Sequence, residues 1–137
     1  MNPARLALYD RAIANRTMAF GSVGVSPHGE TIRFTYTVPA GTIAALRSVM
    51  GEIMRETAAA TAGRCLTFHT MVPLSTILIA IHQATFINNV IGTDALYNVA
   101  GQIVLRAGEI YHGRTFDSST GGTTNINISA LLEETNA

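Results

Sequence analysis

Hydrophobic and polar residues alternate along several short stretches of this chain, and glycine or proline separates one stretch from the next. From Thr31 to Val38, every second side chain is apolar, with threonine or arginine between them. A period of two is typical of a strand with one buried face. The sequence therefore predicts a strand that ends at Pro39–Gly41. Its core-facing residues are predicted to be Ile32, Phe34, Tyr36 and Val38.

The clearest succession of strands runs from Gln102 to Ser129. Three strand-like segments are separated there by two glycine-bearing turns, Ala107-Gly108 and Asp117–Gly122. Such punctuation is typical of antiparallel strands that follow one another directly. The core residues predicted from this stretch are Ile103, Leu105, Ile110, Phe116, Ile126 and Ile128.

Weaker patterns predict the elements before the first of these regions and between the two. Residues 65–72 alternate like a strand, and 75–82 and 85–91 form two further candidates. Residues 20–29 carry glycines and a proline and are predicted to form a loop and hinge, and residues 95–101 a loop or a helical turn.

The segment from Thr42 to Ala62 fits two kinds of element. Ile43, Leu46, Met50 and Ile53 stand at helical intervals, and alanine, methionine, arginine and glutamate favour a helix. Gly51 in its middle disfavours a helix, and the residues also alternate well enough to form a strand. The residues alone leave helix and strand open.

The N-terminal segment has the features of a short helix. Asn2 is a suitable cap with Pro3 in the first turn, and Leu6, Tyr9 and Ile13 follow at helical spacing. A lone helix of this length is marginally stable, so it docks on the domain or reaches a neighbour. We therefore predict an N-terminal arm over residues 1–22 and, over residues 23–137, an all-β, jelly-roll-like antiparallel β-sandwich.

Composition favours a structural subunit over an enzyme or a nucleic-acid-binding protein. The 137 residues suit one domain, and charged residues make up 13% of them, about half the usual share. A surface with so few charges tends to associate with neighbours. The formal net charge is zero, so we expect no nucleic-acid partner. The lone Cys65 and the absence of a long apolar run predict a chain made in a reducing cytoplasm with no membrane partner.

No motif in the chain indicates catalysis. The four histidines, His28, His69, His82 and His112, form none of the close pairs that zinc sites show, so we expect no metal site. Cys65 is expected to be a small, semi-buried apolar residue. The residues of Asp117–Gly122 offer oxygen atoms to calcium, but backbone requirements of a turn explain them better. We expect no enzyme activity, no catalytic residue and no cofactor.

A resemblance to a known family rests on four stretches: Val-Pro-Ala-Gly-Thr at 38–42, Ala-Gly-Arg at 62–64, Gly-Gln-Ile-Val-Leu-Arg-Ala-Gly-Glu-Ile at 101–110, and Thr-Phe-Asp-Ser-Ser-Thr-Gly-Gly at 115–122. In this pattern of turns the chain resembles the small jelly-roll decoration (cement) proteins of tailed-phage capsids, and related phage spike or fibre modules. The resemblance favours strand over helix for residues 42–62.

The resemblance implies a structural virion protein that binds the assembled phage capsid and stabilises it. Its implied partners are the major capsid protein and itself, as a homotrimer, and its implied location is the capsid surface of the virion after synthesis in the host cytoplasm. The predicted capsid or subunit interface lies in the arm, at Arg5, Leu6, Leu8, Tyr9, Arg11, Ile13, Arg16 and Phe20.

Two other functions fit the same fold less well. The sandwich is alternatively a receptor- or glycan-binding head of a phage tail or spike, but the chain has no tryptophan for stacking on sugars. A cupin-like metalloprotein lacks the paired histidines that such a site requires.

Overall fold

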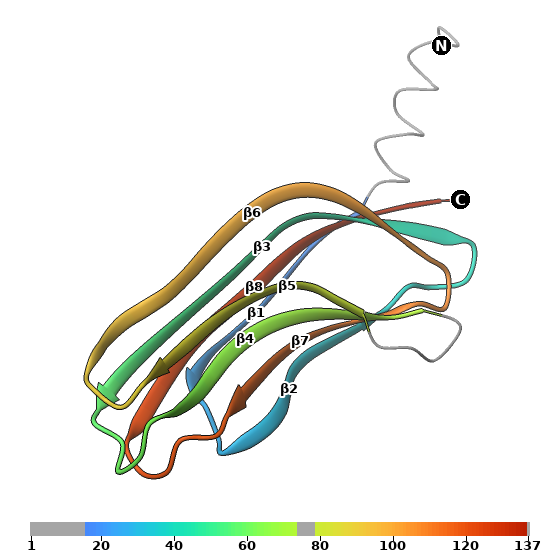
Figure 1. Ribbon diagram of the computed structural model, residues 1–137. Helices are drawn as coiled ribbons and strands as arrows, with labels where there is room; N and C mark the ends of the chain where they lie inside the picture. Colours follow the sequence, from blue (N-terminus) through green and yellow to red (C-terminus); the bar gives the residue numbers. More distant parts are fainter. Residues whose placement is uncertain (1–15, 74–78, 137) are drawn as a thin grey trace, which may run out of the picture.

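The computed structural model describes residues 16–73 and 79–136, which form two antiparallel sheets of four strands each (Figure 1). Sheet A has the strand order β1-β8-β3-β6, and sheet B has the order β2-β7-β4-β5. The strands are β1 (Arg16–Val25), β2 (Gly29–Thr37), β3 (Thr42–Thr57), β4 (Gly63–Val72), β5 (Ile79–Asn88), β6 (Gly92–Arg106), β7 (Ile110–Asp117) and β8 (Thr123–Asn136).

This strand order is that of a jelly roll, so the predicted all-β jelly-roll sandwich is confirmed. Successive strands cross from one sheet to the other, except that β4 and β5 pair directly. The last three strands were expected to be direct neighbours, which is wrong, because β6 and β8 belong to sheet A and β7 to sheet B. A turn signal specifies a change of direction, but it does not specify whether the next strand pairs with its predecessor or crosses over.

The ambiguous segment from Thr42 to Thr57 is strand β3, so the strand interpretation is confirmed and the helix is wrong. A bulge between Leu46 and Ser48 adds one residue to the strand, so that Leu46 and Val49 both face inward. This shift places buried residues three apart within an otherwise alternating strand. Two residues of the helical spacing, Ile43 and Met50, are not buried, so that spacing does not mark one face of the element.

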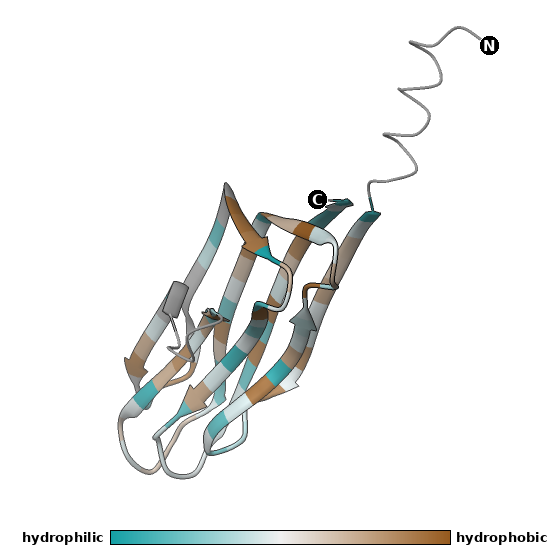
Figure 2. Ribbon diagram, turned by 90° about the vertical axis from the view of Figure 1, so that its right-hand side faces the viewer, coloured by the Kyte–Doolittle hydropathy of each residue, from teal (hydrophilic) through white to brown (hydrophobic). Residues whose placement is uncertain are grey.

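The core consists of two apolar clusters between the sheets, and polarity alternates along the strands (Figure 2). Leu105, Ile126 and Ile128 are buried as predicted, and Ile103 packs against the larger cluster. The prediction for two residues of β7 is wrong. Ile110 and Phe116 face outward, because Tyr111, Thr115 and Asp117 occupy the inward positions of that strand.

A bulge also changes the facing of one residue in β2. The register with β7 shifts between Ile32 and Phe34, so Phe34 and Tyr36 pack into the core while Ile32 is half exposed. Ile32 was predicted to face the core together with Phe34, and this is wrong. The Pro39–Gly41 turn is confirmed, with Gly41 at a φ of 76° and Thr42 N–H donating to Pro39 O.

Strand β1 occupies most of the segment expected to be a loop. Its ten residues pair with β8, and the Phe20 ring lies 5.8 Å from that of Phe34 and 5.6 Å from that of Tyr36. This packing stabilises a strand despite its two glycines, so the loop prediction for residues 20–25 is wrong. Residues 1–15 lie outside the described part of the chain, and the division between arm and sandwich stays a prediction.

Two further expectations are corrected by the strands of the middle region. Residues 95–101 lie inside β6 and form neither a loop nor a helical turn. Of the two strands expected over 75–91, the described residues form a single strand, β5, while residues 74–78 lie outside the described part. The alternating strand expected over 65–72 is confirmed as β4.

Candidate interaction surface

The outer face of sheet B carries a cluster of apolar residues around an arginine. Ile32, Arg114 and Phe68 lie in register across β2, β7 and β4. Phe116 and Leu66 form part of the next row, where they pair with each other. We call these five residues the outer cluster of sheet B. The outer face of an antiparallel sandwich is normally polar, so such a cluster marks a surface suited to a partner.

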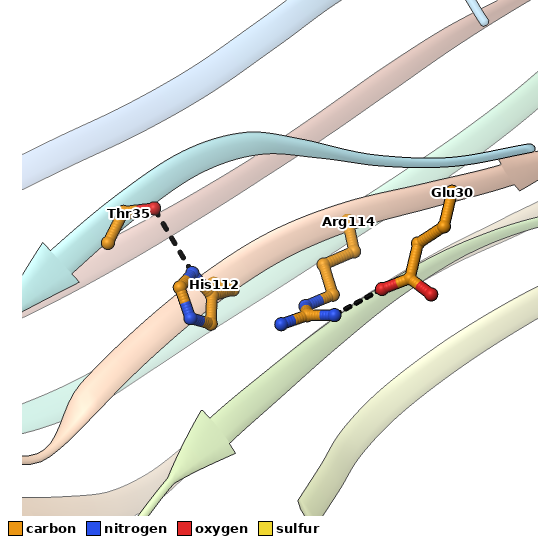
Figure 3. A network of polar contacts seen from close by, with 4 residues as sticks. All are labelled: Glu30, Thr35, His112 and Arg114. Carbon is orange, nitrogen blue, oxygen red and sulfur yellow. Dashed lines mark hydrogen bonds and ion pairs between the residues drawn. The ribbon is translucent and has the colours of Figure 1, made fainter. Parts of the chain in front are cut away.

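An ion pair borders this cluster. Arg114 Nη1 donates to Glu30 Oε1 of the neighbouring strand β2 (Figure 3). The Arg114 side chain is only 13% exposed, and its Nε is buried with no hydrogen-bond partner among the described residues. A buried donor without a partner is costly, so this atom is a candidate contact for a group supplied by another molecule.

His112 lies beside the cluster on the same face of β7. Its Nδ1 is 3.1 Å from Thr35 Oγ1, and the residue is 9% exposed (Figure 3). Burial, followed by the positive charge of Arg114, lowers the pKa of His112 below its ordinary value of 6.5. The ring is therefore neutral at pH 7 and its role is hydrogen bonding rather than charge.

A different kind of site lies at the end of the sandwich where β7 turns into β8. Asp117 Oδ1 accepts hydrogen bonds from Ser119 N at 2.8 Å and from Ser119 Oγ at 2.6 Å. Arg55, which is 1% exposed, donates from Nη1 to the same Ser119 Oγ at 3.0 Å. The turn expected at Asp117–Gly122 is present, with positive φ at Gly121 and Gly122. The carboxylate of its first residue, Asp117, accepts a hydrogen bond from the backbone of the same turn.

Cys65 is fully buried near these charges. Burial, and after it the Asp117 carboxylate, raises the pKa of its thiol to about 12, although Arg55 and Ser26 partly oppose this rise. A thiol with so high a pKa stays protonated and is a poor nucleophile. Its behaviour as a small buried residue agrees with the sequence-based expectation.

The histidines lie in separate parts of the fold. His28 is exposed between β1 and β2, and His69 is fully buried, with Nδ1 against Tyr111 Oη and Nε2 3.2 Å from Met50 O. A carbonyl oxygen can only accept, so Nε2 carries the proton and Nδ1 accepts from the tyrosine. His82 belongs to β5, and its side chain is not among the side chains that the structure describes. Among the described side chains, no group of three or more histidine, cysteine, aspartate or glutamate residues is placed to hold a metal.

The predicted arm interface is only partly within the described chain. Arg5, Leu6, Leu8, Tyr9, Arg11 and Ile13 lie outside it, Arg16 is exposed at the start of β1, and the Phe20 ring packs between the sheets. The interface role of these residues stays a prediction. The outer cluster of sheet B was missed, because its members come from three strands far apart in the sequence.

Among residues 16–73 and 79–136, no helix is long and apolar enough to cross a membrane. No protein-family model and no curated protein sequence matches the chain.

Similar solved structures include three of different kinds. A chain of infectious bursal disease virus, Gx strain, is 10% identical with a TM-score of 0.41 and covers 90% of this chain. A protein of the Bacillus endospore appendages, disulfide-linked pili, is 6% identical with a TM-score of 0.43, covering 90% of each chain. The globular domain of zebrafish complement 1qA protein is 10% identical with a TM-score of 0.45, covering 84% of this chain and 96% of that one. The chain spans 32% of the viral chain's length. Because these TM-scores are below 0.5, the jelly-roll fold is assigned from the strand order of this structure and not from these similarities.

Proposed function

We propose that this chain is a structural virion subunit, a decoration protein that binds the assembled phage capsid and stabilises it by covering surface on the major capsid protein. It acts by binding and has no catalytic role. We further propose that copies associate with one another as a homotrimer on the capsid surface. The few charged residues of the chain and its resemblance to phage decoration proteins support this proposal.

The observation that carries the proposal is the reversed polarity of two strands in sheet B. In β4 the inward positions hold Cys65, Thr67 and His69, while Leu66 and Phe68 face outward. Strand β7 shows the same reversal, with Thr115 and Asp117 inside and Phe116 outside. Apolar residues on the outer face stabilise a free sandwich less than residues of its core do, whereas an interface uses aromatic residues and arginine as its anchors.

A binding assay with charged substitutions tests this proposal. Ile32 belongs to the outer cluster and is 50% exposed, so Ile32→Asp should leave the fold intact while placing a charge in the interface. Capsids that lack the protein are mixed with each variant and sedimented. An aspartate at position 32 removes an apolar contact and lies opposite Arg114, where it would occupy the guanidinium that a partner would otherwise contact, so Ile32→Asp should weaken capsid binding by about tenfold or more.

The matched control is Val23→Asp on sheet A, at a residue 75% exposed, which should bind as the unchanged protein does. Equal binding by both variants would refute sheet B as the interface. Failure of the unchanged protein to sediment with capsids would refute the decoration function itself. The arm is tested by deleting residues 1–15, because β1 begins at Arg16 and a longer deletion removes part of sheet A.

A further inference from the structure

The turn between β7 and β8 and the turn between β1 and β2 enclose a polar hollow of about 310 Å³. Its lining comes from Ser26 and His28 on one side and from residues 117–122 and Thr124 on the other. This volume lies at the lower end of the range of small-molecule sites. The hollow is at the end of the sandwich, so it does not overlap with the outer cluster of sheet B.

Buried polar side chains form the floor of this hollow. Ser26, Asp117, Ser119 and Thr124 are 7%, 5%, 2% and 2% exposed. The backbone carbonyl of Thr124 accepts a hydrogen bond from Ser26 N at 2.7 Å, which holds the residue in place. The Oγ1 atom of Thr124 has no hydrogen-bond partner among the described residues. A buried hydroxyl without a partner costs about 1–3 kcal/mol, and a ligand hydroxyl at this position would remove that cost.

The charges around the hollow indicate a neutral ligand. Among the described residues of the lining, Asp117 is the only acidic one, and the buried Arg55 is connected to its carboxylate through Ser119. Asp117 Oδ1 already accepts two hydrogen bonds from Ser119, so its carboxylate is a weak ligand for a divalent cation, and an anion is repelled by Asp117. The described residues of the lining include no large apolar side chain, which disfavours a lipid chain.

We propose that this hollow binds a neutral polyhydroxylated ligand of monosaccharide size, such as the terminal sugar of a glycan. The Thr124 hydroxyl and the Asp117 carboxylate would bind sugar hydroxyls, and His28 lies at the exposed rim. Because the described residues of the lining include no tryptophan, tyrosine or phenylalanine for stacking, affinity depends on hydrogen bonds and on the fit to the hollow. This site is independent of capsid binding.

The test is an NMR titration of the uniformly ¹⁵N-labelled full chain. Glucose, galactose, mannose and N-acetylglucosamine are each added to about 50 mM, since sites with few contacts bind in the millimolar range. Calcium chloride and sodium phosphate serve as probes of the cation and anion alternatives. At least one sugar should shift the amide signals of Gly121, Gly122 and Thr120, and neither salt should do so.

Two buried threonines provide a matched pair of variants. Thr124→Val removes the unpartnered hydroxyl of a lining residue and should weaken sugar binding by about tenfold. Thr115→Val removes an equally buried hydroxyl without a partner, but one outside the lining, and should leave sugar binding unchanged. The proposal is overturned if no sugar shifts these signals, if either salt shifts them instead, or if Thr124→Val binds as tightly as Thr115→Val.

Discussion

Gly51 is a position in β3 where a single methyl group should disrupt the core. A Cβ atom built there would lie 2.3 Å from Thr67 Oγ1 and 2.5 Å from Tyr97 Cε1. Carbon atoms attract one another at about 3.5–4.0 Å, so both contacts are about 1 Å too short. Thr67 is fully buried and β-branched, and it has little freedom to rotate away. The backbone of Gly51 is not in the left-handed region, so the effect of Gly51→Ala is overpacking alone.

Overpacking a dense core costs about 1–3 kcal/mol, and two short contacts at one site place Gly51→Ala in the upper half of that range. In urea, where unfolding free energy falls by about 1–3 kcal/mol per molar, the midpoint should decrease by about 1 M. The measurement is equilibrium unfolding followed by far-ultraviolet circular dichroism. Combining Gly51→Ala with Thr67→Ala removes the nearer contact, so the double variant should lose less stability than the two single changes added together.

Gly21→Ala in β1 is the matched control. This glycine is also in a strand, but the nearest atoms to its Cβ would be Ile128 O and Ser129 Cβ, both at 3.8 Å. Its free energy of unfolding should change by no more than about 0.5 kcal/mol. An unchanged midpoint for Gly51→Ala would refute the overpacking argument. An equal loss in both variants would also contradict it, because the backbone of a strand favours alanine over glycine and only a steric clash at Gly51 is expected to lower stability.

Three further predictions concern the polar groups of sheet B and its turn. The pKa of His112 is lowered in the folded state, by burial first and by Arg114 second. Its contribution to stability is therefore full above about pH 6.5 and falls as the pH decreases below that value. His112→Gln should reduce the dependence of the unfolding free energy on pH, measured by urea unfolding from pH 7.5 to 5. Tyr111→Phe leaves the buried Nδ1 of His69 without its donor and should cost about 1–3 kcal/mol, and unchanged stability would contradict the assigned hydrogen bond. Ser119→Ala removes the hydroxyl that joins a buried guanidinium to a buried carboxylate, so thermal unfolding should occur several degrees lower.

The alternation of apolar and polar residues predicted the positions of the strands well. It predicted much less well which face of each strand is buried. In β2 and β3, bulges near Ile32 and Leu46 change the facing of residues, and the sequence contains no visible sign of an extra residue in the register. Strand β1 was missed, because two glycines conceal a strand that Phe20 anchors to the opposite sheet. These errors have one cause: the side of a strand that is buried depends on its neighbours in the sheet, which the local pattern does not specify.

The same dependence explains why the outer cluster of sheet B was not predicted. The pattern of β7 suggested that Ile110 and Phe116 belong to the core, on the reasonable assumption that apolar residues face inward. The structure instead places Thr115 and Asp117 inside, where Asp117 caps the turn that encloses the polar hollow. A strand must present one of its two faces outward, so the use of the inner face for this polar framework leaves Phe116 on the surface. If the outer face is only a solvated surface, Phe116→Ser should lower the unfolding midpoint through the loss of its cross-strand pair with Leu66 and leave association unchanged. If it is an interface, the same change should also weaken association by more than this loss of stability accounts for, and this contrast separates a packing accident from a binding surface.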